Sequence, residues 1–179
     1  MNIDPLLQPI SELAPAGVDL RSLAGDLTLE QIRDLRSEVA PDEDWANGQG
    51  KDPDWPSIVA TCDTALRTRT KDLEVANALT EAWARTLGFE GLASGIELVH
   101  ELCERFWDCV HPGCENGEII APIRARHLSW LGGPDTFLSS VRHAPLLDRH
   151  DRSTLSWAQR QDTLRREALR LTSQAAWKE

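Results

Sequence analysis

The amino-acid sequence predicts an all-α fold, an array of about six to seven antiparallel helices in one domain. Apolar residues recur at intervals of three and four along most of the chain, the spacing that gathers them on one face of a helix. Residues that cap helices precede these runs, and Pro or Gly residues follow them. No clear alternation of apolar and polar residues indicates a strand. The length of 179 residues allows one sizeable hydrophobic core.

Residues 1–27 are predicted to form an irregular leader packed on or ahead of the helical domain, which spans residues 28–179. Pro and Gly residues interrupt any long helix in this leader, at Pro5, Pro9, Pro15, Gly17 and Gly25. The first helix is expected to begin at Thr28, where Thr28 and Gln31 have the spacing of a capping box, and to end before Pro41.

Two further helices have clear starting residues. Asp54 is placed to cap a helix that fades near Thr70, and the polar, Gly-containing stretch 42–53 before it is predicted to be a loop. Asp72 is placed to cap the next helix, and Gly88 is well placed to end it.

The second half of the chain is predicted to contain helices at about 92–110, 120–131, 135–142 and 154–177. Pro112 stops the first of these, and residues 144–153 are expected to form a loop. The last helix carries an apolar stripe, consisting of Leu155, Leu164, Ala168, Leu171 and Ala175. We expect this stripe to pack against its own domain; self-association with a second copy is the other interpretation.

Composition and charge limit the class of partner. The net charge of −10 argues against a nucleic-acid-binding face, because phosphate contacts require clustered Lys and Arg. No apolar run approaches the roughly 20 residues that span a bilayer, and the N-terminus lacks the pattern of a secretion signal. Four cysteines are too few for a disulfide scaffold. We therefore expect a cytoplasmic protein with reduced thiols that is not inserted in a membrane.

Five short blocks of sequence carry a resemblance to a known family. They read PAGVDL from Pro15 to Leu20, DPDW from Asp52 to Trp55, TKDLEVA from Thr70 to Ala76, GFEGLASG from Gly88 to Gly95, and FWDCVHP from Phe106 to Pro112. In this order they resemble the N-terminal domain of ImpA-type proteins, the TssA components of the bacterial type VI secretion system. Phe106 departs from the Tyr usual in the family, and the resemblance thins after Pro112.

Most residues of these blocks also have a structural interpretation, as helix starts, tight corners and core side chains. We expect core positions for Trp83, Phe106 and Trp107, since a helical aromatic stripe is usually buried. The family residues expected to specify the fold are Pro15, Gly17, Asp19, Leu20, Pro53, Asp54, Trp55, Lys71, Asp72, Leu73, Gly88, Gly91, Leu92, Gly95, Trp107, Asp108, His111 and Pro112.

The resemblance implies a non-enzymatic assembly component of the secretion system. Its expected partners are baseplate, sheath or tube, and membrane-complex proteins. It also implies that homo-oligomerisation depends mainly on a C-terminal region outside this chain, reached through the last helix. No catalytic residue, cofactor or metal ligand is implied.

Exposed aromatic and Arg side chains are the expected anchors of such docking contacts. The candidates are Trp45 in the acidic loop, followed by Trp157, Arg160, Arg165 and Arg166 on the last helix. The competing interpretation of the arginines is a solvated helix face paired with neighbouring acids.

A small metal-binding or metal-dependent hydrolytic domain is the alternative function. It would use a cluster of possible ligands formed by His100, Cys103, Cys109, His111 and Cys114. The motif around His100 lacks the second His of the zinc-protease pattern, and the spacing of Cys103 and Cys109 places them on different faces of one helix. Reduced core cysteines are the simpler interpretation.

Overall fold

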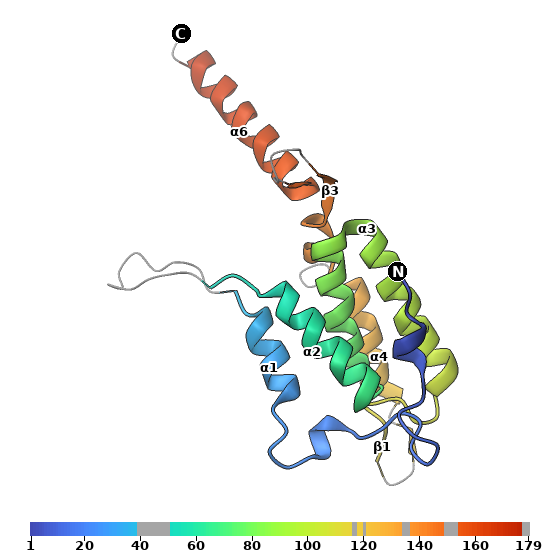
Figure 1. Ribbon diagram of the computed structural model, residues 1–179. Coiled ribbons are helices and arrows are strands. Elements are labelled where there is room, and N and C mark those ends of the chain that lie inside the picture. The colour runs from blue at the N-terminus through green and yellow to red at the C-terminus, as the bar shows by residue number, and fades with distance from the viewer. Residues whose placement is uncertain (39–50, 116–117, 120, 134–136, 149–153, 177–179) are drawn as a thin grey trace.

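A pair of helices at the centre of the molecule, α2 (Trp55–Thr68) and α3 (Leu73–Phe106), forms the core of the fold (Figure 1). The computed structural model describes residues 1–38, 51–115, 118–119, 121–133, 137–148 and 154–176. The predicted cap of α2 is confirmed, since the Asp54 carboxylate accepts a hydrogen bond from the Ser57 N–H at 3.1 Å. The apolar stripe of α2 is buried against α3 through Ile58, Cys62, Ala65 and Leu66.

Gly88 divides α3 into two segments that lie against each other. Its φ of 67° and ψ of −142° interrupt the helix, so the predicted end of a helix at Gly88 is confirmed. A β-carbon added at Gly91 would lie 2.2 Å from the carbonyl oxygen of Trp83, and one at Gly95 would lie 2.5 Å from the side chain of Thr80. The glycine block of the sequence therefore permits close approach of the two segments.

Helix α1 (Thr28–Arg36) packs on α2, but the predicted capping box is wrong. The side chain of Thr28 accepts a hydrogen bond from Arg69 at 2.7 Å, and it makes no cap. The Asp26 carboxylate instead accepts from the Thr28 N–H at 2.9 Å. This hydrogen bond and the ion pair with Arg69 lower the pKa of Asp26 to about 2. The described part of α1 ends at Arg36, before the predicted limit at Pro41.

The N-terminal segment contains two short 3₁₀ helices, η1 (Asp4–Leu7) and η2 (Leu20–Ser22). Five of its apolar side chains are buried in the hydrophobic core, namely Ile3, Leu6, Leu7, Ala16 and Leu20. The segment thus contributes core surface as well as a path to α1.

The chain after α3 forms shorter elements. These are β1 (Cys114–Glu115), β2 (Glu118–Ile119), α4 (Ala121–Ser129), η3 (Trp130–Gly132), α5 (Phe137–Arg142), β3 (Pro145–Asp148), β4 (Thr154–Ser156) and α6 (Trp157–Ala176). The strands pair as two antiparallel hairpins, β1 with β2 and β3 with β4. The predicted loop at 144–153 was therefore wrong in part, because residues 145–148 pair with 154–156. For the same reason the last helix begins at Trp157. The predominantly helical fold class is confirmed.

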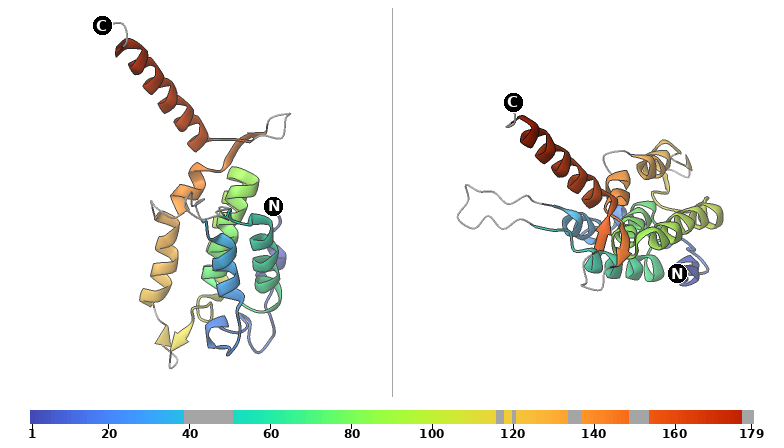
Figure 2. Two further views of the ribbon diagram at one scale, coloured as in Figure 1. Left: turned by 90° about the vertical axis from the view of Figure 1, so that its left-hand side faces the viewer. Right: turned by 90° about the horizontal axis from the view of Figure 1, so that it is seen from above.

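Helix α6 projects away from the helical body (Figures 1 and 2), so the expected packing of this helix on its own domain is wrong. Its described apolar side chains are exposed, with Leu164 at 48% and Leu169 at 64% of full accessibility. In the described residues, no helix is both long and apolar enough to cross a membrane.

The segment Thr70–Leu73, which precedes α3, joins the N-terminal segment to the end of α3. The Lys71 N–H donates to the carbonyl of Ala16 at 2.7 Å. On the other side, the His111 N–H donates to the carbonyl of Lys71, and the Leu73 N–H donates to the carbonyl of His111, both at 2.8 Å. We call the segments 16–18, 70–73 and 110–112 together the junction.

Lys71 stabilises the junction with its side chain as well as its backbone. The side chain is completely buried, and its Nζ donates to the carbonyl oxygens of Leu6 and Leu66, each at 2.6 Å. The ammonium group also lies 5.8 Å from the centre of the Phe106 ring. Burial lowers the pKa of Lys71 to about 8, a value at which the group is still mainly charged at neutral pH.

We expect Lys71→Met to reduce the free energy of unfolding by about 2–4 kcal/mol, because two buried carbonyl groups would lose a charged donor. Urea denaturation followed by circular dichroism measures this change. Lys51→Met is the matched control, since Lys51 makes an exposed ion pair with Asp34 and should change stability by at most about 1 kcal/mol. Equal effects of the two substitutions would contradict this role of Lys71.

Candidate functional site

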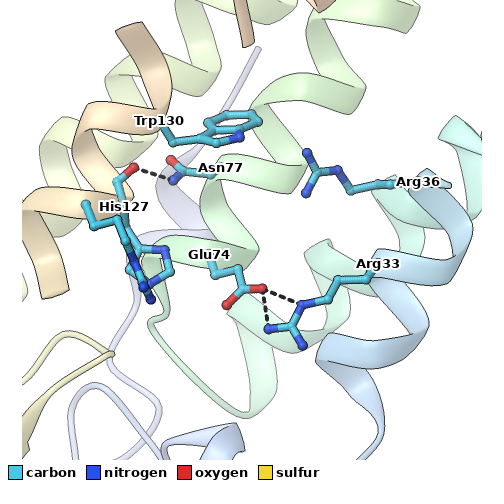
Figure 3. A pocket seen from close by; sticks show the side chains of 7 residues that line it. Arg33, Arg36, Glu74, Asn77, His127 and Trp130 are labelled. Carbon is cyan, nitrogen blue, oxygen red and sulfur yellow. Dashed lines mark hydrogen bonds and ion pairs between the residues drawn. The ribbon is translucent and has the colours of Figure 1, made fainter. Parts of the chain in front are cut away.

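A polar pocket lies between α1, α3 and α4 (Figure 3). It has a volume of about 330 Å³ and is lined by Arg33, Arg36, Glu74, Asn77, Arg126, His127 and Trp130. We call it the arginine pocket. Helix α1 provides the first two arginines, α3 provides the floor, and α4 with η3 provides the opposite wall.

The floor of the pocket comes from a polar stripe on a helix that is otherwise largely buried. Glu74, Asn77, Glu81 and Arg85 are spaced by three and four residues, so they share one face of α3. Asn77 is only 5% exposed, and its Nδ2 donates to the carbonyl oxygen of His127 at 2.8 Å. Its Oδ1 is buried and accepts no hydrogen bond from the described part of the chain.

Glu74 is the acidic group of the pocket, and it is already paired. It accepts from Arg33 Nε at 2.9 Å and from Arg21 at 2.6 Å. Burial alone would raise the pKa of Glu74, but the two guanidinium groups outweigh it and lower the pKa. Glu74 therefore carries its negative charge at neutral pH, and that charge is shared between Arg33 and Arg21.

Arg36 and Arg126 supply the further positive charges of the pocket. Arg36 pairs with Glu81 and lies 5.4 Å from the centre of the Trp130 ring. The Arg36 Nε is buried and donates to no group among the described residues. Arg126 is exposed and makes no ion pair with any described residue.

A second pocket, of about 400 Å³, adjoins the first where Arg36 and Trp130 line both. It continues along α3 past Glu81 and Arg85 towards Trp55 and the α5 side chains of Ser139 and Ser140. The Arg85 guanidinium stacks on Trp55 at 4.9 Å, which fixes one end of this second pocket.

The arginine pocket has the chemistry of a binding site. Guanidinium groups bind carboxylates and phosphates, and a buried amide binds peptide groups. Its described lining contains no Ser, Thr or Cys nucleophile beside His127.

The proposed metal cluster does not form in the part of the chain that the structure describes. No three His, Cys, Asp or Glu side chains there lie close enough together to hold a metal ion. Cys103 and Cys109 are both free thiols and partly buried, and His100 is exposed on α3. Burial raises the pKa of the Cys103 thiol, which disfavours the thiolate that a metal would require.

Comparison with known proteins identifies the family. Residues 7–133 match the family described as "ImpA, N-terminal, type VI secretion system". The chain belongs to the ImpA N-terminal family.

Two relatives agree with this assignment. Type VI secretion system component TssA1 of Pseudomonas aeruginosa is 36% identical over 118 residues, which are 63% of this chain and 32% of that protein. A solved N-terminal domain of TssA from Burkholderia cenocepacia, including the conserved ImpA_N region, is 32% identical with a TM-score of 0.68. That comparison covers 99% of this chain and 61% of the other. The ImpA-type chain thus spans about a third of the curated relative that it matches.

Many ImpA-type motif residues have structural roles. Lys71 and Asp72 lie in the junction with Gly17, and the His111 ring nitrogen Nε2 lies 3.3 Å from the Gly17 carbonyl oxygen. The Asp72 carboxylate caps α3 by accepting from the Glu74 N–H at 2.7 Å. It also accepts from Arg21 at 2.5 Å, which links the cap of α3 to the ion pairs of the arginine pocket.

The expected core position of Trp107 is wrong, whereas Trp83 and Phe106 are buried as predicted. Trp107 is 40% exposed and stacks on the Arg124 guanidinium at 5.0 Å. Arg124 is fully buried, and its guanidinium donates to the carbonyls of Trp107, Val110 and Pro112. These hydrogen bonds compensate for the lost hydration of the charge and hold α4 against the segment that follows α3. These hydrogen bonds leave the indole at the surface, above the guanidinium.

The interaction residues expected from sequence lie outside the arginine pocket. Trp45 falls outside the described residues. Trp157 is 46% exposed on α6, with the Arg142 guanidinium 5.8 Å from its ring centre, and Arg160, Arg165 and Arg166 are exposed on the same helix. Sequence reasoning missed the arginine pocket, although the polar spacing of α3 was a signal that could have revealed its floor.

We expect the His127 imidazole to titrate below pH 6.5 in the folded domain. Burial has the largest effect and lowers its pKa. The charges of Asp72 and Glu74 raise the pKa by smaller amounts, and those of Arg21 and Arg126 lower it further. Since the unfolded chain takes up this proton at higher pH, the His127 contribution to stability decreases as the pH falls through 6.5. NMR titration of the His127 ring measures the midpoint. Arg126→Gln should raise it, and a wild-type midpoint at or above 6.5 would contradict the burial effect.

Proposed function

We propose that this ImpA-type domain is a non-enzymatic docking module for assembly of the type VI secretion system. Its partners are proteins of the baseplate, the sheath or tube, or the membrane complex, and it acts in the cytoplasm. The family match over residues 7–133 carries the proposal. All residues that line the arginine pocket lie within that range.

The surface chemistry supports docking. Described side chains on two different elements place guanidinium groups beside aromatic rings, at Arg36 with Trp130 and at Arg142 with Trp157. Trp and Arg are the residue types that most often dominate the energy of protein interfaces. A net charge of −10 directs the remaining surface towards basic partners.

Homo-oligomerisation belongs, in this proposal, mainly to a C-terminal region of the parent protein. Helix α6 projects from the body with exposed Leu164 and Leu169, in the direction from which such a region would continue (Figure 2). Its Arg160, Arg165 and Arg166 form a second candidate docking surface with Trp157.

The immobilised chain should capture secretion-system proteins from a lysate of cells that express the apparatus. Mass spectrometry should show enrichment of baseplate, sheath, tube or membrane-complex proteins over a lysate from cells lacking the gene cluster. Failure of the wild-type chain to enrich any of them would contradict docking by this domain.

Substitution of the sequence-predicted anchors should reduce that capture. Trp45→Ala and Trp157→Ala each remove a large aromatic contact surface, and loss of a dominant interface residue typically weakens binding at least about tenfold. The same capture assay measures the loss, with Trp107→Ala as a matched exposed-aromatic comparison. Unchanged capture by either variant removes that residue from the docking surface.

A further inference from the structure

We propose that the arginine pocket binds an acidic, extended peptide segment of a partner protein. In this arrangement a carboxylate of the segment pairs with Arg36 and Arg126, and a backbone N–H of the segment donates to Asn77. The inference deepens the proposed docking function and rests on it, because it names the chemistry of the partner at one site.

The charge of the pocket favours an anion. Three arginines line it, and the acidic side chain in its lining, Glu74, already accepts hydrogen bonds from Arg33 and Arg21. Arg126 has no ion-pair partner in the described structure. Arg33 and Arg36 pair with Glu74 and Glu81, so Arg126 is the lining arginine whose charge no described carboxylate neutralises, and an acidic ligand would be attracted to it.

Two buried polar atoms favour a ligand that both accepts and donates hydrogen bonds. The Asn77 Oδ1 lacks a donor and the Arg36 Nε lacks an acceptor within the described residues. A buried polar atom without a partner costs about 1–3 kcal/mol, so a ligand that satisfies both would recover that free energy. A peptide with an acidic side chain offers a backbone N–H and a carboxylate close together.

The dimensions of the site favour a peptide segment over a bulky ligand. A volume of about 330 Å³ is at the lower end of small-molecule sites and can accommodate an acidic side chain with its peptide group. The second pocket, of about 400 Å³, shares Arg36 and Trp130 with the first, so flanking residues of an extended segment have further space beside these two side chains.

NMR titration of the ¹⁵N-labelled chain tests the proposal with capped peptides of defined sequence. The probe is Ac-Gly-Glu-Gly-Glu-Gly-NH₂, and its comparison replaces each Glu by Gln. The Glu peptide should shift the side-chain amide signals of Asn77 and the indole N–H signal of Trp130. We expect it to bind at least about tenfold more tightly than the Gln peptide, and less tightly as salt increases.

Arg126→Gln is the decisive variant because Arg126 is exposed and its loss should leave the fold intact. It should weaken binding of the Glu peptide about tenfold, the typical effect of losing one charge-assisted hydrogen bond. Arg105→Gln is the matched control, since Arg105 is exposed on α3 with an ion pair to Glu101 and lies outside the pocket lining. Equal binding of the Glu and Gln peptides, or unchanged binding by Arg126→Gln, would overturn the proposal.

Sulfate distinguishes a peptide site from a site for small anions. It can pair with the arginines but has no N–H to donate to Asn77. If sulfate produced the same shifts with the same affinity as the Glu peptide, the pocket would be a small-anion site and the peptide assignment would be wrong.

The capture assay separates failure of this inference from failure of the docking function. If the wild-type chain and Arg126→Gln capture the same secretion-system proteins equally well, docking stands and the arginine pocket is not the docking site. If the wild-type chain captures none, docking fails, while the peptide titration still decides whether the pocket binds acidic peptides.

Discussion

The buried ammonium group of Lys71 is the interaction on which the arrangement of the domain depends. It connects carbonyl oxygens of η1 and α2, and the backbone of the same residue connects the N-terminal segment to the end of α3. A charge in a hydrophobic core is tolerated only where hydrogen bonds replace its hydration. Segments far apart in sequence must therefore meet at the junction with little freedom, which explains why residues of several motif blocks lie together there.

The arginine pocket depends on that junction through a short series of contacts. Asp72 follows Lys71, caps α3 and accepts a hydrogen bond from Arg21, which also pairs with Glu74 on the pocket floor. The position of the floor is thus determined by the start of α3. Helices α1 and α4 then form the walls. Arg124 holds α4 in place by donating to the carbonyl oxygen of Val110, which follows the end of α3.

Local signals in the sequence predicted much of the fold but little of the candidate site. Asp54, Asp72 and Gly88 act where the sequence placed them because capping and left-handed backbone depend on nearby residues. Thr28 failed as a cap because a distant arginine, Arg69, occupies its hydroxyl group. The pocket combines α1, α3 and α4, and contacts of that range leave no trace in local spacing beyond the polar stripe of α3.

That polar stripe has a consequence for the stability of the domain. The Oδ1 of Asn77 is buried and has no donor among the described residues, so the folded chain carries the cost of desolvating that atom. Any ligand that satisfies this atom binds the folded chain and not the unfolded one, and so shifts the folding equilibrium as it binds. A partner that donates a hydrogen bond to Asn77 would therefore stabilise the folded domain by more than its own contacts suggest.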